Sequence, residues 1–198
     1  MDEFQRLKNL IPRDLNCLIS ISSNTKKSTN LIHTSKINDG KFEIVINSKQ
    51  WTKLEPNQRD LMFWHEIYKI KSNKISNYRW EKIVIAIGVS SSLMEILSHN
   101  VFSLSVILLV TALVTYRLYQ GQTGEQAILI DTTADQGAVR LATDFGYSFW
   151  DACNSLRDAL KFLAKNTSNK SISTRYIVRL QVLKVFAFKQ EQRELSLV

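Results

Sequence analysis

The sequence has few of the residues that stabilise small proteins through covalent links. Among its 198 residues it has only two cysteines, Cys17 and Cys153, and no Cys-x-x-Cys pair. Two cysteines are too few for a disulfide framework, and both lie among apolar residues, so we expect them to pack as small hydrophobic side chains. A glycine-rich phosphate loop is also missing, which excludes the P-loop class of nucleotide-binding proteins. The N-terminal residues are acidic and no apolar run follows them, so we expect no cleaved signal peptide.

Acidic residues are outnumbered by basic ones. The chain has 26 Lys and Arg against 18 Asp and Glu, a net charge of +8, and residues 165–198 carry seven Lys or Arg against two Glu. This balance favours anionic partners such as lipid head groups, nucleic acid or an acidic protein. The simpler interpretation is a solvated basic surface beside a membrane.

Uncharged apolar sequence is concentrated in residues 83–116, where Glu95 is the only charged residue. Two apolar runs, Ile83–Leu97 and Val101–Tyr116, are separated by a short polar break. A single helix of this length would exceed the roughly 20 residues that cross a bilayer, so we expect a transmembrane helical hairpin. Basic residues at both ends of the segment predict that both termini are cytoplasmic. The alternative is a buried helical hairpin in a soluble protein.

Apolar periodicity and turn residues predict the other elements. Asn38-Asp39-Gly40 lies between two alternating segments and indicates a β-hairpin, and Pro56 marks the start of a helix. Ser148, followed three residues later by Asp151, is typical of a helix N-terminus. The expected elements are a helix at 4–11, a strand at 15–21, hairpin strands at 31–37 and 41–47, helices at 56–71, 125–145, from Ser148 to about 163 and at 176–188, and a polar linker at 165–173.

One group of residues has a pattern associated with catalysis. His65-Glu66-Ile67-Tyr68-Lys69 lies on the predicted helix 56–71. In a His-Glu-x-x-His motif, two His one turn apart bind zinc and the Glu activates a water molecule. Here Lys69 occupies the second His position, and the other histidines, His33 and His99, are far away in the sequence. An ammonium group repels a metal ion, so we expect no bound metal and a vestigial Glu66.

The order of elements around His65 resembles that of the HtpX-type integral-membrane zinc peptidases. The resemblance covers about residues 31–163 and places Asp131 at the third ligand position and Asp135 in the Ala-Asp pair that follows it. It implies an α+β fold: a mostly helical, minigluzincin-like domain with a small N-terminal β-hairpin and the inserted transmembrane hairpin. The implied peptidase-like domain comprises residues 1–82 and 117–164, with a basic C-terminal segment at 165–198.

The chain also resembles an uncharacterised family of cyanobacterial membrane proteins. The residues that carry this resemblance are Gln58-Arg59-Asp60-Leu61, which run into Phe63-Trp64-His65-Glu66. It implies the cyanobacterial plasma or thylakoid membrane as the location of the multi-pass protein that the two-helix hairpin predicts, and it offers no established activity to carry over.

The changes at Lys69 and Asp131 suggest how the vestigial site is arranged. We expect the Lys69 ammonium to supply the positive charge that zinc supplies in the peptidases, with Glu66 or Asp131 as its counter-charge. Loss of one partner from such a buried pair would cost roughly 3–5 kcal/mol. The alternative is that Lys69 is exposed and Glu66 is solvated.

These observations favour a non-catalytic, membrane-anchored pseudopeptidase that acts as a scaffold, adaptor or assembly factor. Its expected partners are the lipid bilayer and an unidentified protein, and we expect neither a cofactor nor a nucleic-acid partner. One alternative is an active zinc peptidase whose ligands are His65, Asp131 and either Glu125 or Asp135. A second is a basic peripheral protein that binds anionic lipid or RNA through residues 165–198.

Overall fold

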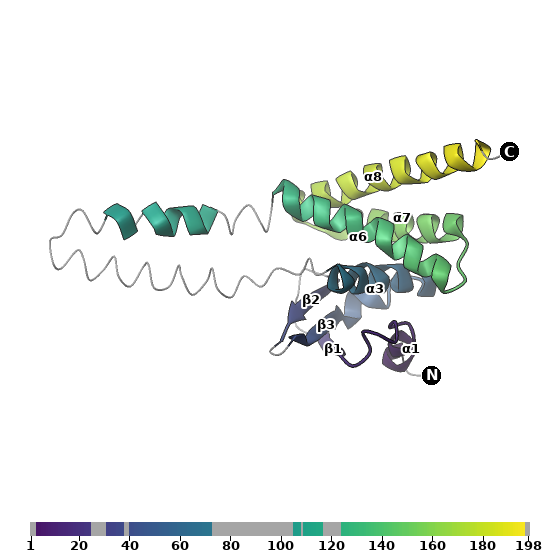
Figure 1. Ribbon diagram of the computed structural model, residues 1–198, viewed down its shortest axis with the longest axis horizontal. Coiled ribbons are helices and arrows are strands. Elements are labelled where there is room, and N and C mark those ends of the chain that lie inside the picture. Colours follow the sequence, from purple (N-terminus) through teal and green to yellow (C-terminus); the bar gives the residue numbers. More distant parts are fainter. Residues whose placement is uncertain are drawn as a thin grey trace. The chain divides into compact units, whose positions relative to one another are not determined.

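A computed structural model of the chain describes residues 3–24, 31–37, 40–72, 105–107, 109–116 and 124–196. The chain divides into two compact units, one formed by residues 1–75 and 130–198 and the other by residues 76–129. In the second unit, the described residues 105–107 and 109–116 are helical. All other elements lie in the first unit, apart from the first residues of α6 (Figure 1).

A small sheet forms one side of the first unit. Its strands β1 (Ile19–Asn24), β2 (Ile32–Lys36) and β3 (Phe42–Asn47) have the order β1-β3-β2. β2 and β3 are antiparallel, which confirms the predicted hairpin, whereas β1 pairs with β3 in parallel. The first strand begins four residues later than expected, because residues 15–18 form hydrogen-bonded turns.

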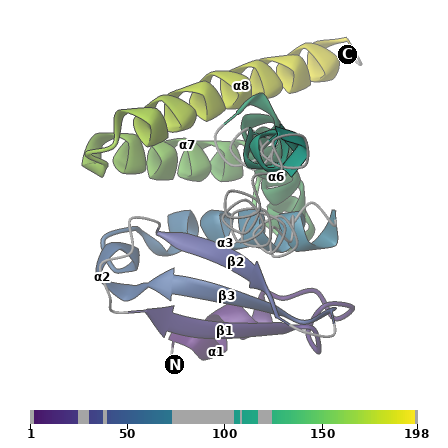
Figure 2. The same cartoon turned by 90° about the vertical axis from the view of Figure 1, so that its left-hand side faces the viewer.

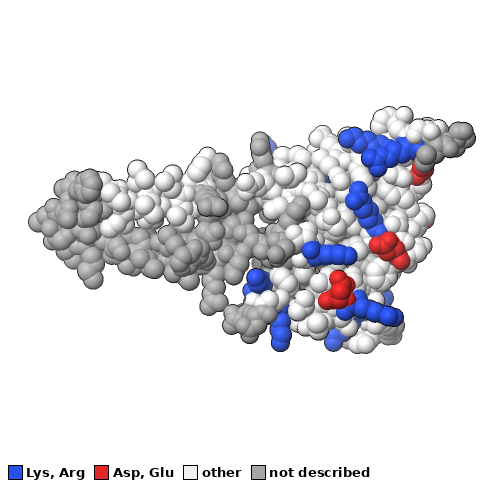
Figure 3. Space-filling model, in the orientation of Figure 1, with Lys and Arg blue, Asp and Glu red and all other residues white. Residues whose placement is uncertain are grey.

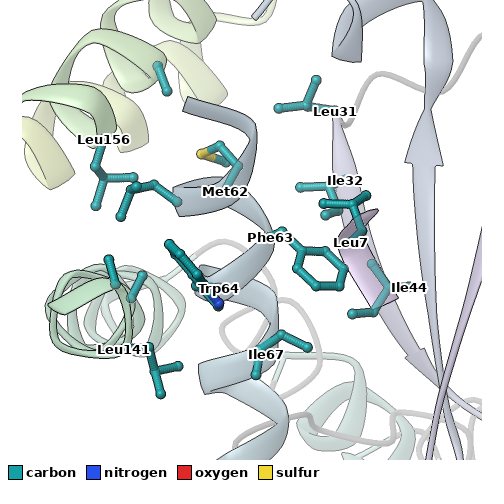
Figure 4. Close-up of a cluster of buried hydrophobic side chains, with 14 of the residues drawn as sticks. Leu7, Leu31, Ile32, Ile44, Met62, Phe63, Trp64, Ile67, Leu141 and Leu156 are labelled. Atoms are coloured by element: carbon teal, nitrogen blue, oxygen red, sulfur yellow. The ribbon is translucent and has the colours of Figure 1, made fainter. Parts of the chain in front are cut away.

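Helix α3 (Pro56–Lys71), which has the predicted bounds, lies between the sheet and the other long helices (Figure 2). Phe63 lies beside Ile32 and Ile44 of the sheet, whereas Trp64 lies on the side of Leu156, which belongs to the helical layer (Figure 4). Eight consecutive residues, from Asp60 to Ile67, are buried. A helix enclosed in this way buries every face, so its polar residues must find partners inside the protein.

The helical layer consists of α6 (Glu125–Asp144), α7 (Phe149–Asn166) and α8 (Lys170–Leu195). Gly146 adopts a φ of 91° in the turn that follows α6, a conformation that favours glycine. The Ser148 hydroxyl accepts a hydrogen bond from the Asp151 backbone N–H, as the sequence predicted. The expected polar linker at 165–173 is shorter than predicted, because α7 continues to Asn166 and α8 begins at Lys170.

Two short helices, α1 (Glu3–Asn9) and α2 (Ser48–Trp51), complete the unit. Glu3 links them, since its carboxylate accepts hydrogen bonds from Arg6 and from the Trp51 indole at 3.0 Å. These donors, the Arg6 guanidinium above all, lower the pKa of Glu3 to about 2. Arg6 also pairs with Asp60 of α3, which ties the N-terminal helix to the centre of the fold.

The predicted fold class needs one correction. The protein is mostly helical with a small sheet, but the inserted transmembrane hairpin at 83–116 is not supported. Residues 73–104 lie outside the described part of the chain, and they include the whole of the first apolar run. Among the residues that the structure does describe, no helix is both long enough and apolar enough to cross a membrane.

Helices α3 and α6 approach each other closely at Gly137. A Cβ atom added at this position would overlap with the Tyr68 ring of α3. Glycine in the middle of a helix costs about 1 kcal/mol relative to alanine, so its presence here is explained by the space that it leaves for Tyr68.

We predict that Gly137→Ala lowers the free energy of unfolding by about 1–3 kcal/mol, because the added methyl group forces the Tyr68 ring to move. In a Tyr68→Ala background the same change should be neutral, or stabilising by up to about 1 kcal/mol through helix propensity. Urea unfolding of the four proteins measures both effects. An equal loss in the two backgrounds would contradict the packing explanation.

Candidate functional site

A group of buried charged side chains joins three helices and one strand of the first unit. We call it the buried charge cluster, and its members are His65, Glu66 and Lys69 of α3, Asp131 and Asp135 of α6, Arg175 and Arg179 of α8, and Thr34 of β2. Each helix contributes residues four positions apart, which lie on the same helical face. The two pairs between α6 and α8 are each separated by 44 residues, which is the pattern of two helices that run in parallel.

Asp135 and Arg179 form the most deeply buried part of the cluster. The guanidinium makes two hydrogen bonds with the carboxylate, from Nε to Oδ2 at 2.8 Å and from Nη2 to Oδ1 at 2.6 Å. Asp135 is 1% exposed and Arg179 is 4% exposed. Paired hydrogen bonds of this kind fix the orientation of both groups as well as the distance between them.

His65 is held in one orientation by the same aspartate. Its Nδ1 lies 2.7 Å from Asp135 Oδ1, and because an ionised carboxylate only accepts, Nδ1 carries the hydrogen and donates. The neighbouring Arg179 Nη2, 3.2 Å from Nδ1, is then a contact between two donors. His65 Nε2 points to the other end of the cluster, 3.7 Å from Glu66 Oε1 and 3.7 Å from Asp131 Oδ1.

Glu66 has a partner on each oxygen. Oε1 accepts a hydrogen bond from the Lys69 ammonium at 3.0 Å, and Oε2 accepts one from the Thr34 hydroxyl at 2.7 Å. Thr34 lies two residues after Ile32 on β2, on the same face of the strand, and that face packs against α3. The Glu66 side chain is therefore buried, at 4% exposure, and the alternative of a solvated Glu66 is wrong.

Three basic side chains lie near the Asp131 carboxylate. Arg175 Nε donates to its Oδ2 at 2.7 Å, Arg179 Nη1 lies 3.8 Å from the same oxygen, and the Lys69 ammonium lies 3.8 Å from Oδ1. Lys69 and Asp131 thus approach each other, and Lys69 keeps 22% of its side chain exposed.

The basic side chains keep the three buried carboxylates ionised. Burial is the largest single influence and would raise the pKa of each, but the neighbouring groups together outweigh it, chiefly Lys69 and His65 for Glu66 and Arg179 and His65 for Asp131 and Asp135. All three pKa values are consequently held below the ordinary range for carboxylic acids. Three carboxylates face three cations, so the formal charges of the cluster cancel when His65 is neutral.

The cluster does not fit a divalent metal ion. Among the residues that the structure describes, no group of three or more His, Cys, Asp or Glu side chains is arranged to hold one. Zinc needs ligand bonds of about 2.0–2.2 Å, and the Lys69 ammonium already occupies one lone pair of Glu66, the residue next to His65. Since the three carboxylates are already paired with Lys69, Arg175 and Arg179, little negative charge is left to attract an added dication.

The structure brings together His65, Glu66, Lys69, Asp131 and Asp135, the residues named from the sequence. Their description as a former metal site stays a prediction. His33 lies in β2, as a strand residue, and His99 lies outside the described residues. Sequence reasoning missed Arg175, Arg179 and Thr34. The two arginines had one signal, a four-residue spacing that matches the spacing of Asp131 and Asp135.

Comparison with known proteins places the chain among cyanobacterial relatives. The family model described as "Protein of unknown function (DUF3318)" matches residues 5–147. The "Thylakoid membrane protein slr1949" of Synechocystis sp. (strain ATCC 27184 / PCC 6803 / Kazusa) is 33% identical over 193 residues, which cover 98% of this chain and 91% of that protein. No solved structure matches the chain. These findings support the resemblance to a cyanobacterial membrane protein family and give no support to the HtpX resemblance.

We predict that Arg179→Met lowers the free energy of unfolding by about 3–5 kcal/mol, because it leaves Asp135 buried with no cation beside it. Arg175→Met is the matched control. Its side chain is 34% exposed and Asp131 retains Arg179 and Lys69, so we expect a loss of about 1 kcal/mol or less. Urea denaturation measures both changes. Equal losses would show that burial does not determine how much each ion pair contributes to the free energy of unfolding.

The buried carboxylates also predict an acid-labile fold. Their pKa values in the folded protein lie below the unfolded values of about 4, so their contribution to stability is complete above about pH 5. It is lost as the pH falls through 4 towards the folded values. Urea unfolding between pH 7 and pH 3 should show this decline, and Arg179→Met should show a smaller one. A stability that does not change over this range would contradict the assignment.

Proposed function

The chain belongs to the DUF3318 family, and from this premise we propose that it is a non-catalytic scaffold or assembly protein of a cyanobacterial membrane. The observation that carries the proposal is the closed, charge-balanced state of the buried charge cluster. The cluster contains the residue types of a hydrolytic site, but each is paired with another residue of the protein.

Burial supports a structural role for the cluster. His65 is 2% exposed and Glu66 is 3% exposed, so neither can reach a substrate unless the helices separate. A general base must come within hydrogen-bond distance of the proton that it removes. Lys69 and Arg175, which do reach the surface, have no basic lone pair while they are protonated, and each already donates to a buried carboxylate.

The cluster is well suited to hold the first unit in one arrangement. It connects α3, α6, α8 and β2, and each of its pairs joins residues that are distant in sequence, apart from Glu66 and Lys69. Buried ion pairs contribute little net stability, but they penalise any other arrangement in which a charge loses its partner. A rigid body of this kind can present surfaces to a partner protein, which we expect but do not identify.

Association with a membrane is supported by the relative whose name describes a thylakoid membrane protein and which matches nearly the whole chain. The net charge of +8 is consistent with an anionic membrane surface. The proposal therefore includes the membrane as a partner and includes neither nucleic acid nor a cofactor.

The proposal predicts that the purified protein takes up far less than one zinc ion per chain, because the Lys69 ammonium excludes the metal. Lys69→His removes the ammonium and places a second imidazole one turn from His65, so it should increase zinc uptake. Lys69→Gln is the matched control, since it removes the charge without adding a nitrogen ligand of this type. Elemental analysis after equilibration with zinc and dialysis measures all three proteins.

Two results would contradict the proposal. Stoichiometric zinc in the unmodified protein, lost in His65→Ala, would indicate a metal enzyme instead of a scaffold. Recovery of the tagged protein away from the membrane fraction of cyanobacterial cells would reject the membrane association. If Lys69→His took up no more zinc than Lys69→Gln, the ammonium would not be what excludes the metal.

A further inference from the structure

A groove with positive charge lies between α6 and α8, at the surface of the first unit. Its volume is about 270 Å³. The residues that matter for its chemistry are Arg140 of α6 and Val182, Val185, Phe186, Lys189 and Arg193 of α8. Those of α8 recur at intervals of three and four, so they form one continuous face of the helix.

Within the described part of the chain, no acidic side chain neutralises the three basic residues of the groove. No acidic residue lines it, and among the described residues no carboxylate lies within ion-pair distance of Arg140, Lys189 or Arg193. Glu194, the neighbouring acid on α8, accepts a hydrogen bond from Gln190 at 3.1 Å. Figure 3 shows basic side chains gathered over the C-terminal part of α8. The basic residues of the groove differ in this respect from those of the buried charge cluster, each of which is paired with a carboxylate.

Arg140 is positioned rather than loosely solvated. Its guanidinium carbon lies 6.0 Å from the centre of the Phe186 ring, within the range of a cation–π contact. The ring leaves the hydrogen-bond donors of the guanidinium free. Arg140 can therefore make the paired hydrogen bonds with a phosphate or sulfonate group for which a guanidinium is suited.

The rim of the groove is apolar. Val182, Val185 and Phe186 line the groove, and Val185 is 54% exposed. A ligand that satisfies this surface has an anionic end for the three cations and an apolar part for these side chains. A free inorganic anion would leave the apolar rim in contact with water, and a nucleic acid would leave it largely unused.

We propose that the groove between α6 and α8 binds the anionic head group of a membrane lipid, with the acyl chains directed along Val185 and Phe186. This inference rests on the proposed membrane association and adds to it a site of contact. Helices that bind at a membrane interface combine basic residues on a polar face with aromatic or aliphatic side chains on an apolar face, so that both the head groups and the acyl chains are contacted.

The test compares the full-length protein with two triple variants in vesicle sedimentation. The groove variant carries Arg140→Gln, Lys189→Gln and Arg193→Gln. The control variant carries Lys8→Gln, Lys41→Gln and Lys49→Gln, which remove the same charge from exposed positions elsewhere on the first unit. The vesicles are phosphatidylcholine alone or an equimolar mixture with phosphatidylglycerol.

We expect the unmodified protein to bind the mixed vesicles and not the neutral ones. The groove variant should bind roughly a hundredfold more weakly, because each of the three basic residues near an anionic surface contributes about fivefold. The control variant should retain nearly all of the binding. All substituted residues are exposed, so circular dichroism should show that the variants fold as the unmodified protein does.

Three results would overturn the inference. An equal loss in both variants would show that general charge, and not the groove, attracts the vesicles. Inorganic phosphate that shifts the NMR signals of the groove residues, with vesicle binding unaffected in the groove variant, would identify a free anion as the ligand. Binding of RNA in place of vesicles would identify a different partner.

The outcomes separate this inference from the proposed function. If the unmodified protein is absent from the membrane fraction of cells, the proposed function fails. If it is present there and the groove variant binds vesicles as tightly as the unmodified protein, only the groove is excluded as the site of contact.

Discussion

The pair formed by Arg179 and Asp135 is the interaction on which the rest of the first unit depends. Both groups are almost completely buried, and each would be costly to bury alone. Their paired hydrogen bonds fix α8 against α6, and Asp135 in turn orients His65 of α3. A single carboxylate thus sets the relative positions of three helices. The pairing of Arg175 with Asp131 repeats the same 44-residue offset one turn away, so a shift of α8 along α6 would break both pairs together.

This constraint explains why charged residues occur in the most enclosed helix of the fold. Helix α3 packs against the sheet through Phe63 and against the helical layer through Trp64, and His65 and Glu66 follow on the remaining face. Polar residues on that face require partners, and Thr34 and Asp135 provide them from other elements while Lys69 provides one from α3 itself. These partners fix the orientation of α3, because a rotation of the helix about its axis would leave buried charges unpaired and would expose aromatic rings.

The sequence predicts those parts of the fold that depend on local signals. The hairpin turn at Asn38-Asp39-Gly40, the helix start at Pro56 and the cap at Ser148 were all read from neighbouring residues, and the structure has the elements they indicate. The parallel pairing of β1 with β3 was missed, because it depends on contacts between distant residues. Arg175 and Arg179 were missed for a related reason. They belong to a segment rich in basic residues, and only the tertiary structure distinguishes its buried arginines from its exposed ones.

Helix α8 therefore carries basic residues of two kinds at different positions along the face that it turns to α6. Arg175 and Arg179 are paired with aspartates of α6, whereas Lys189 and Arg193 line the groove and form no ion pair within the described residues. On α6, likewise, Asp135 is paired within the buried charge cluster, whereas Arg140 lines the groove. The ion pairs of the buried charge cluster hold α8 against α6. The groove lies a few turns further along the same two helices, so the cluster also determines the distance between the helices there. A groove whose two helices are already held in place needs little reorganisation to bind a ligand. In this way the buried charge cluster, which binds nothing itself, supports the groove that we propose as a binding site.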